Sequence, residues 1–118
     1  MVYLHPGCST CQKAVAWLTE HGIAHETRDI RETPPGVEEL RRMREHLGSL
    51  SKLCNTSGMD YRKLGLKEKL PAMTEDEAFA LLAGNGMLIK RPFVLTADGG
   101  VTGFREPAWA MLFGGAAK

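Results

Sequence analysis

Cys8 and Cys11 are separated by two residues, and they lie between a short apolar run and an amphipathic helical pattern. Two cysteines at this spacing, one in a turn and one in the first turn of a helix, can bring their sulfur atoms to about 2.05 Å with little backbone movement. Free N–H groups at a helix start stabilise a thiolate, so we expect Cys8 to be the more acidic thiol. The pattern predicts a redox pair in which Cys8 attacks a disulfide or oxidised substrate and Cys11 resolves the intermediate.

The alternatives to a redox pair are a zinc site and a structural disulfide. A zinc site needs two further ligands, usually a second pair at short spacing. Cys54 stands alone, and no paired ligand spacing occurs among the four histidines, His5, His21, His25 and His46. A disulfide between Cys8 and Cys11 closes a loop too short to constrain the unfolded chain much. We therefore favour redox chemistry and expect no metal, with structural zinc as the weaker alternative.

Length and charge limit the classes of protein to which the chain can belong. Its 118 residues, 43% hydrophobic and 25% charged, suit one globular domain. Lysine and arginine number 15 against 14 for aspartate and glutamate, so no overall field attracts nucleic acid or an anionic membrane. The basic run at residues 41–44 is mixed with acidic residues and is interpreted as an ion-paired surface. We expect no direct binding to nucleic acid or membrane.

The first residues and the hydropathy pattern indicate the compartment. The start of the chain lacks the basic and long apolar regions of a secretory signal, and the longest apolar run, residues 79–83, is too short to span a bilayer. We therefore expect a cytoplasmic protein. Reducing conditions there disfavour permanent disulfides, which favours a catalytic or sensing role for the thiol pair.

A strand, a helix and a second strand are expected around the pair. Residues 2–4 predict a short strand that ends at Pro6 and Gly7. Apolar residues at helical spacing predict a helix over residues 10–21, and residues 23–30 predict a second strand. A single helix with short loops between the two strands predicts that they are parallel and joined by a right-handed crossover.

Helices and a hairpin are expected over the rest of the chain. The expected elements are a helix over 37–47 closed by Gly48, a short helix over 61–64 stopped by Gly65, a helix that begins at a capping box of Thr74 and Glu77 and ends at Gly84, strands over 93–96 and 101–104, and a last helix over 107–112. An Asp-Gly step predicts a hairpin at residues 97–100, and residues 114–118 are expected to fray. A thiol pair at the front of this order of elements is typical of an α/β, thioredoxin-like fold.

Several short motifs occur in an order and spacing that are specific when taken together. They are Gly-Cys-Ser-Thr-Cys at residues 7–11 with Lys13, Trp-Leu at 17–18, Gly-Ile at 22–23, Asp-Ile at 29–30, Pro-Pro at 34–35, Asn-Thr-Ser-Gly at 55–58 with Tyr61, Leu-Gly-Leu at 64–66, and Gly-Met-Leu-Ile-Lys-Arg-Pro at 86–92 with Val94. From residue 2 to about residue 113, the chain resembles the arsenate reductase/Spx (ArsC-like) family of thioredoxin-like proteins, in the branch with two cysteines.

The resemblance implies one thioredoxin-like domain over residues 1–118 with a four-stranded mixed sheet. Its core would comprise about residues 1–33 and 91–113, with a helical insertion of about residues 34–90 between the two halves. In such folds the proline before the third strand is usually cis and faces the redox pair. The resemblance implies this geometry for Pro92.

The resemblance also implies a site for an anionic substrate. Arginines bind the oxyanion in the family's arsenate reductases, because the planar guanidinium suits tetrahedral anions. Arg91 and Arg105 match two of these positions, whereas Asn55 stands where the family has a third arginine, which weakens the argument for arsenate. Cys11 replaces a serine of those enzymes. Because an internal thiol has a high effective concentration, the cycle would close an internal disulfide.

Four residues outside this set have two interpretations. Cys54 is either a buried small apolar residue, which we favour, or a third thiol that reaches the site through the Asn55 loop. Lys13 is either a solvated helix residue or a helper of the Cys8 thiolate. Trp17 and Trp109 fall on helix faces, and we expect them in the core rather than in a substrate platform.

The leading hypothesis is an enzyme, a thiol–disulfide oxidoreductase of the arsenate-reductase-like type with Cys8 and Cys11 as catalytic residues. Its substrate site would consist of Arg91, Pro92, Arg105 and Asn55. We expect a monomer without a bound cofactor that acts on a small thiol, a protein disulfide or an oxyanion, with thioredoxin or glutathione as electron donor.

The alternative is an Spx-like regulator that binds RNA polymerase and uses the thiol pair as a redox sensor. Against it, residues 114–118 lack the charged C-terminal region typical of those regulators.

Overall fold

A four-stranded mixed sheet forms the centre of the structure. The structure is a computed structural model that describes residues 1–56, 58–96 and 99–113. In these ranges the strands are β1 (Val2–Leu4), β2 (Thr27–Asp29), β3 (Phe93–Leu95) and β4 (Gly100–Thr102), in the spatial order β2-β1-β3-β4. β1 pairs parallel with β2, and β3 pairs antiparallel with both β1 and β4. The prediction of an α/β, thioredoxin-like fold with a four-stranded mixed sheet is confirmed.

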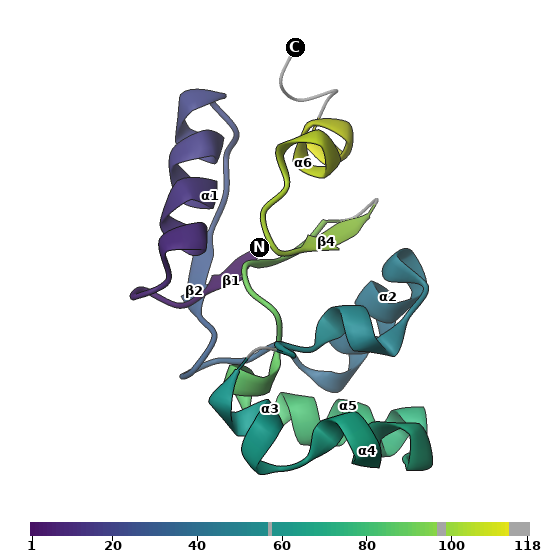
Figure 1. Ribbon diagram of the computed structural model, residues 1–118. Coiled ribbons are helices and arrows are strands. Elements are labelled where there is room, and N and C mark those ends of the chain that lie inside the picture. The colour runs from purple at the N-terminus through teal and green to yellow at the C-terminus, as the bar shows by residue number, and fades with distance from the viewer. Residues whose placement is uncertain (57, 97–98, 114–118) are drawn as a thin grey trace.

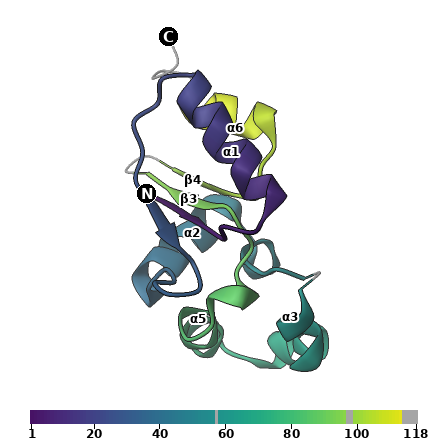
Figure 2. The same cartoon turned by 90° about the vertical axis from the view of Figure 1, so that its left-hand side faces the viewer.

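Helices cover both faces of this sheet. They are α1 (Ser9–Glu20), α2 (Val37–Leu47), α3 (Met59–Lys63), α4 (Leu66–Lys69), α5 (Glu75–Ala83) and α6 (Glu106–Phe113), with the short 3-10 helices η1 (Leu50–Leu53), η2 (Leu70–Ala72) and η3 (Gly86–Leu88). α1 and α6 lie on one side of the sheet, whereas α2 to α5 lie on the other (Figure 1). The view turned by 90° shows α1 and α6 together above β3 and β4 (Figure 2).

Side chains alternate between the two faces of the sheet and thereby form two apolar cores. The core under α1 and α6 contains Val2, Ala14, Trp17, Leu18, Ile23, Val94 and Trp109. The core on the opposite face contains Tyr3, Phe93 and Leu95 together with side chains of α2 and α5 such as Leu40, Met43, Phe79 and Leu82. Trp17 and Trp109 are 8% and 0% exposed, so their prediction as core residues is confirmed.

The strand predicted over residues 23–30 is wrong in its first half, because β2 is shorter. The amide of Gly22 donates to the carbonyl of Thr19 (3.1 Å), and the amide of Ile23 donates to the carbonyl of Leu18 (3.0 Å). These two bonds form a Schellman motif that ends α1, with Gly22 in the left-handed region at φ 66°. Ile23 is buried in the same core as Leu18. Its apolar character therefore serves the end of the helix and not a strand.

The strand predicted over residues 101–104 also ends early. Gly103 follows β4 with φ 72°, which an extended strand does not contain. Its carbonyl oxygen accepts a hydrogen bond from Nε1 of Trp109 at 2.9 Å, so the chain turns here toward α6. Residues 97–98 of the predicted hairpin turn and the predicted fraying of residues 114–118 lie outside the described residues.

The longer helices and the short helix predicted over residues 61–64, which is α3, lie close to their predicted positions. α2 ends at Gly48 in the left-handed conformation, and α5 begins with the reciprocal capping box of Thr74 and Glu77. The sequence did not predict α4 or the 3-10 helices. The chain between β2 and β3 carries α2 to α5, and the division into a core and an insertion stays a prediction. Within the described ranges, no helix is long and apolar enough to cross a membrane.

Ion pairs join α2 to α5 at the surface. Arg41 contacts Asp76 at 3.1 Å, and Arg44 contacts Glu75 at 2.6 Å. The interpretation of residues 41–44 as an ion-paired surface is confirmed.

Candidate functional site

Cys8 occupies the N-cap position of α1, with extended backbone angles of φ −90° and ψ 118°. Its own amide donates to the carbonyl of His5 at 3.0 Å. Its Sγ accepts a hydrogen bond from the amide of Cys11 at 3.4 Å. The sulfur therefore takes the place of the side-chain oxygen that usually caps a helix. Cys11 lies in the first turn of α1 and is only 1% exposed, so the turn and helix positions expected for the two thiols are found.

The surroundings of the two thiols make their acidities differ. Partial burial acts to raise the pKa of Cys8, but hydrogen bonds from the amide and thiol of Cys11 and from the amide of Thr10, with the charge of Arg91, bring this pKa below the ordinary thiol value. Burial raises the pKa of Cys11 to about 11, and the neighbouring Cys8 acts in the same direction. All three cysteines are free thiols. The arrangement favours a thiolate at Cys8 and a neutral thiol at Cys11.

The guanidinium of Arg91 is a candidate anion-binding group. It precedes β3, and its peptide bond to Pro92 is cis, as the family resemblance implies. Nε and Nη1 of Arg91 are buried, and neither has a hydrogen-bond partner in the part of the chain that the structure describes. Buried polar atoms in folded proteins are normally paired. Because the charge of Arg91 acts on Cys8, an anion bound beside Cys8 would also meet this guanidinium.

One pocket of about 370 Å³, which we call the thiol pocket, brings four of the expected site residues together. Cys8, Asn55, Arg91 and Arg105 all line it. The sheet explains this, because the end of β1, the start of β3 and the end of β4 lie at one edge and lead to three of these side chains. Pro92 is buried and is not among the lining residues.

The thiol pocket also contains residues that the sequence analysis did not assign to a site. They are Thr10, Lys90, Thr102, Gly103 and Phe104. Lys90 had a visible signal, because it stands beside Arg91 in the Lys-Arg-Pro run. Gly103 and Phe104, which follow β4, had no such signal in the sequence, because the pairing of β4 with β3 brings them close to Cys8. Lys13 is exposed on α1 and does not line the pocket, as expected of a solvated helix residue.

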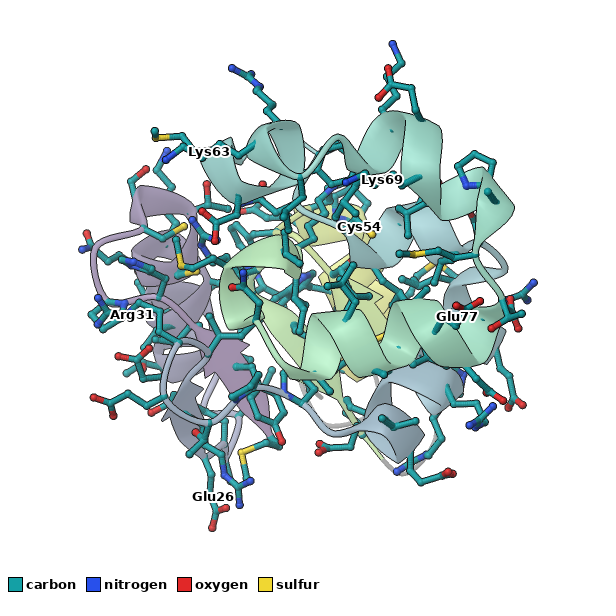
Figure 3. All side chains as sticks on the ribbon, turned by 90° about the horizontal axis from the view of Figure 1, so that it is seen from below. Glu26, Arg31, Cys54, Lys63, Lys69 and Glu77 are labelled. Atoms are coloured by element: carbon teal, nitrogen blue, oxygen red, sulfur yellow. The ribbon has the colours of Figure 1, made fainter. Side chains whose placement is uncertain are left out.

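Asn55 and Cys54 are adjacent but face different surroundings. The amide of Asn55 donates to the carbonyl of Leu88 at 2.8 Å, and Asn55 contributes a neutral side chain to the thiol pocket. Cys54 forms a β-bridge with Ile89 and is 2% exposed. Burial raises its pKa to about 11. In Figure 3, Cys54 lies toward the middle of the molecule, whereas Arg31 is at its rim. The structure supports the buried interpretation of Cys54.

A bound metal ion needs several ligating side chains close together. Within residues 1–56, 58–96 and 99–113, no three or more His, Cys, Asp or Glu side chains are grouped so that they could hold an ion.

A thiol pair at a helix start, a cis-proline before the third strand and the order β2-β1-β3-β4 define a thioredoxin-like protein. The sequence model of the ArsC family matches residues 3–112. The chain therefore belongs to the ArsC family, and the resemblance to the arsenate reductase/Spx group is confirmed.

Three similar proteins show how closely this family relationship holds. Uncharacterized protein YusI from Bacillus subtilis is 50% identical over 105 residues, which cover 88% of this chain and 89% of that protein. Global transcriptional regulator Spx from Listeria innocua is 27% identical over 106 residues, which cover 89% of this chain and 79% of that protein. The crystal structure of an ArsC family related protein from Bacteroides fragilis is 46% identical, covers 94% of each chain and has a TM-score of 0.88.

Proposed function

We propose that this chain is a thiol–disulfide oxidoreductase of the arsenate-reductase-like type, with Cys8 as the attacking thiolate and Cys11 as the resolving thiol. The observation that carries the proposal is the placement of both thiols at one helix start, where the Cys11 amide donates to Sγ of Cys8 and the sulfur lines an open pocket. The lowered pKa of Cys8 and the raised pKa of Cys11 agree with these roles.

The reaction is an exchange of thiols and disulfides. The Cys8 thiolate attacks one sulfur of a substrate disulfide, the S–S bond of the substrate breaks, and one substrate thiolate leaves. Cys11 then loses its proton to solvent, attacks Sγ of Cys8, closes the internal disulfide and releases the second substrate thiolate. Two electrons pass from the pair to the substrate. Thioredoxin or glutathione, which are kept reduced in the cytoplasm, would return them to a monomeric enzyme without a bound cofactor.

Arg91 and Arg105 would hold an anionic part of the substrate. The buried Nε and Nη1 of Arg91 lack partners among the described residues, and a carboxylate or oxyanion can accept a hydrogen bond from one of them. Asn55 adds no charge at the position where the family's arsenate reductases have an arginine. This difference supports a disulfide as substrate over arsenate.

Reduction of glutathione disulfide and of insulin by the purified protein tests this function. Cys8→Ser should abolish turnover. Cys11→Ser should stop after one attack, with a mixed disulfide on Cys8 that mass spectrometry detects. Cys54→Ala is the matched control, because Cys54 is buried away from the pocket and its loss should leave turnover unchanged. Full turnover by Cys8→Ser would reject the proposal.

A second candidate is an Spx-like redox-sensing regulator, which the similarity over 106 residues to a regulator of that name favours. Its test is binding of purified RNA polymerase to the reduced and the oxidised protein. If the polymerase binds only one redox state and the protein turns over neither disulfides nor arsenate, the redox-sensing regulator is the better proposal and the oxidoreductase is rejected.

A further inference from the structure

A second pocket adjoins the thiol pocket. It has a volume of about 240 Å³, and we call it the lysine pocket because Lys52 and Lys90 both line it. Four residues form the wall that the two pockets share, namely Lys90, Thr102, Gly103 and Arg105. The two pockets are therefore adjacent, with Cys8 in one and Lys52 in the other.

Cations line both pockets, and no carboxylate of the described residues does. Lys52, Lys90, Arg91 and Arg105 contribute positive charges to their walls. Among residues 1–56, 58–96 and 99–113, none of the four forms an ion pair, whereas two arginines of α2 are paired with acids of α5. The chain as a whole is nearly neutral, with a formal net charge of +1. The unpaired charges are therefore a local feature, and such a lined cleft attracts anions.

Long-range contacts hold the two lysines in place. Oγ1 of Thr102 donates to the carbonyl of Lys52 at 2.8 Å. The amide of Lys90 donates to the carbonyl of Leu53, also at 2.8 Å. Gly103 leaves room for the Lys90 side chain, because a Cβ at Gly103 would lie 2.9 Å from Cε of Lys90. The lysine pocket is thus built from η1, the chain before β3 and the end of β4, together with residues of α2 and α6.

From this layout we propose that the lysine pocket binds a carboxylate of the substrate, and that the preferred substrate is a small disulfide with carboxylates remote from its sulfur atoms. This inference rests on the proposed thiol–disulfide function. A compact oxyanion at Cys8 would leave the lysine pocket empty, whereas pockets of several hundred Å³ bind larger small molecules. One carboxylate accepts from Arg91, and a distant one accepts from Lys52 and Lys90.

The same binding mode fits a balanced reaction. Cys8 attacks the nearer sulfur, forms a mixed disulfide with one half of the substrate and expels the other half as a thiolate. The retained half keeps its carboxylate in the lysine pocket. Cys11 then attacks Sγ of Cys8, closes the internal disulfide and releases the retained half as a thiolate. An external dithiol of the thioredoxin class reduces the pair again.

A series of three disulfides that differ in charge tests the lysine pocket in the full chain. Glutathione disulfide carries carboxylates, bis(2-hydroxyethyl) disulfide is neutral, and cystamine is cationic. Lys52→Gln should raise KM for glutathione disulfide on the order of threefold with little change in kcat, as expected for the loss of one exposed ion pair. KM for the neutral disulfide should stay the same. Added salt should reduce the difference between the two substrates.

Two variants serve as controls. Lys63→Gln makes the same change in net charge on α3, away from both pockets, and should leave all three substrates unaffected. Lys52→Arg should restore the KM of the parent protein. If Lys52→Gln changes KM equally for glutathione disulfide and for the neutral disulfide, or changes neither, the proposed role of the lysine pocket is wrong. Absence of turnover with every disulfide, although Cys8 is intact, overturns the proposed function instead, so the two failures are distinct.

Discussion

The N-cap position gives two sulfur atoms three residues apart opposite acid–base properties. Cys8 faces amide N–H groups and a guanidinium, which favour its anion. Cys11 points into the protein, where burial favours the neutral thiol. A helix start can therefore activate one thiol and keep its neighbour protonated until the attack has taken place.

In the reduced protein, iodoacetamide should alkylate Cys8 before Cys11. Because its pKa is lowered, Cys8 has more thiolate at neutral pH than an unfolded cysteine, and its alkylation rate should level off at a lower pH. Cys11 should react fully only as the pH approaches about 11. Peptide mass spectrometry of time courses at several pH values measures both rates. Similar rates for the two thiols at neutral pH would contradict the assignment.

Arg91→Met should stabilise the fold and impair the reaction. An unpaired buried polar group costs about 1–3 kcal/mol, and methionine fills a similar volume without donors. We expect the free energy of unfolding in urea to rise by about 1 kcal/mol, while KM for an anionic disulfide increases. Arg105→Met is the control, because this exposed arginine should change stability by less than about 0.5 kcal/mol. A less stable Arg91→Met protein would show that the guanidinium supports the fold.

At the scale of elements, η3 connects the helical segment to the sheet through a close backbone contact. A Cβ on Gly86 would overlap with the carbonyl oxygen of Ile30, which follows β2. Gly86→Ala should therefore force the two segments apart and destabilise the protein by more than about 3 kcal/mol, measured by urea unfolding. Gly84→Ala is the matched control, since a Cβ there would lie 3.4 Å from the carbonyl oxygen of Ala80. Comparable losses in the two variants would contradict the close approach.

Elements with local signals could be predicted from the sequence. The capping box of Thr74 and Glu77 located the start of α5, and Gly48 located the end of α2. Ile23 misled the prediction of β2, because a buried residue of a Schellman motif resembles a strand residue in its hydropathy. The 3-10 helices were missed because they are only three or four residues long, which is too short for a helical hydrophobic period to show in the sequence.

Some features of the candidate site could likewise be predicted from the sequence, and others could not. The spacing of Cys8 and Cys11 indicated the chemistry, and the family motif indicated Arg91 and Arg105. The sequence could not show that Nε and Nη1 of Arg91 lack partners, because this depends on all of the neighbouring segments. It also could not bring Lys52 next to Lys90, since the contact of η1 with the end of β4 joins residues 50 positions apart.

At the scale of the whole molecule, the lowered pKa of Cys8 couples the redox state of the thiol pair to the stability of the fold. Folding lowers the pKa of Cys8, so the folded, reduced protein binds fewer protons than the unfolded chain over the range between the two pKa values. This contribution is present in full above the pKa of an unfolded cysteine and is lost as the pH falls through the pKa of folded Cys8. The oxidised protein has no thiol at Cys8 and lacks the contribution.

The stability of the reduced protein relative to the oxidised one should therefore increase with pH across this range. Cys11 opposes the trend only in alkaline solution, because its pKa of about 11 lies above that of an unfolded cysteine. Cys54 is a free thiol in both forms, so its contribution to the pH dependence cancels in the difference between them. Urea unfolding of both forms at a series of pH values measures the difference, and reduced Cys8→Ser should lack the rise seen in the reduced parent. A difference that stays constant as the pH falls from the pKa of an unfolded cysteine, about 8.5, through the neutral and acidic range would mean that folding does not stabilise the Cys8 thiolate, since stability must follow the proton balance.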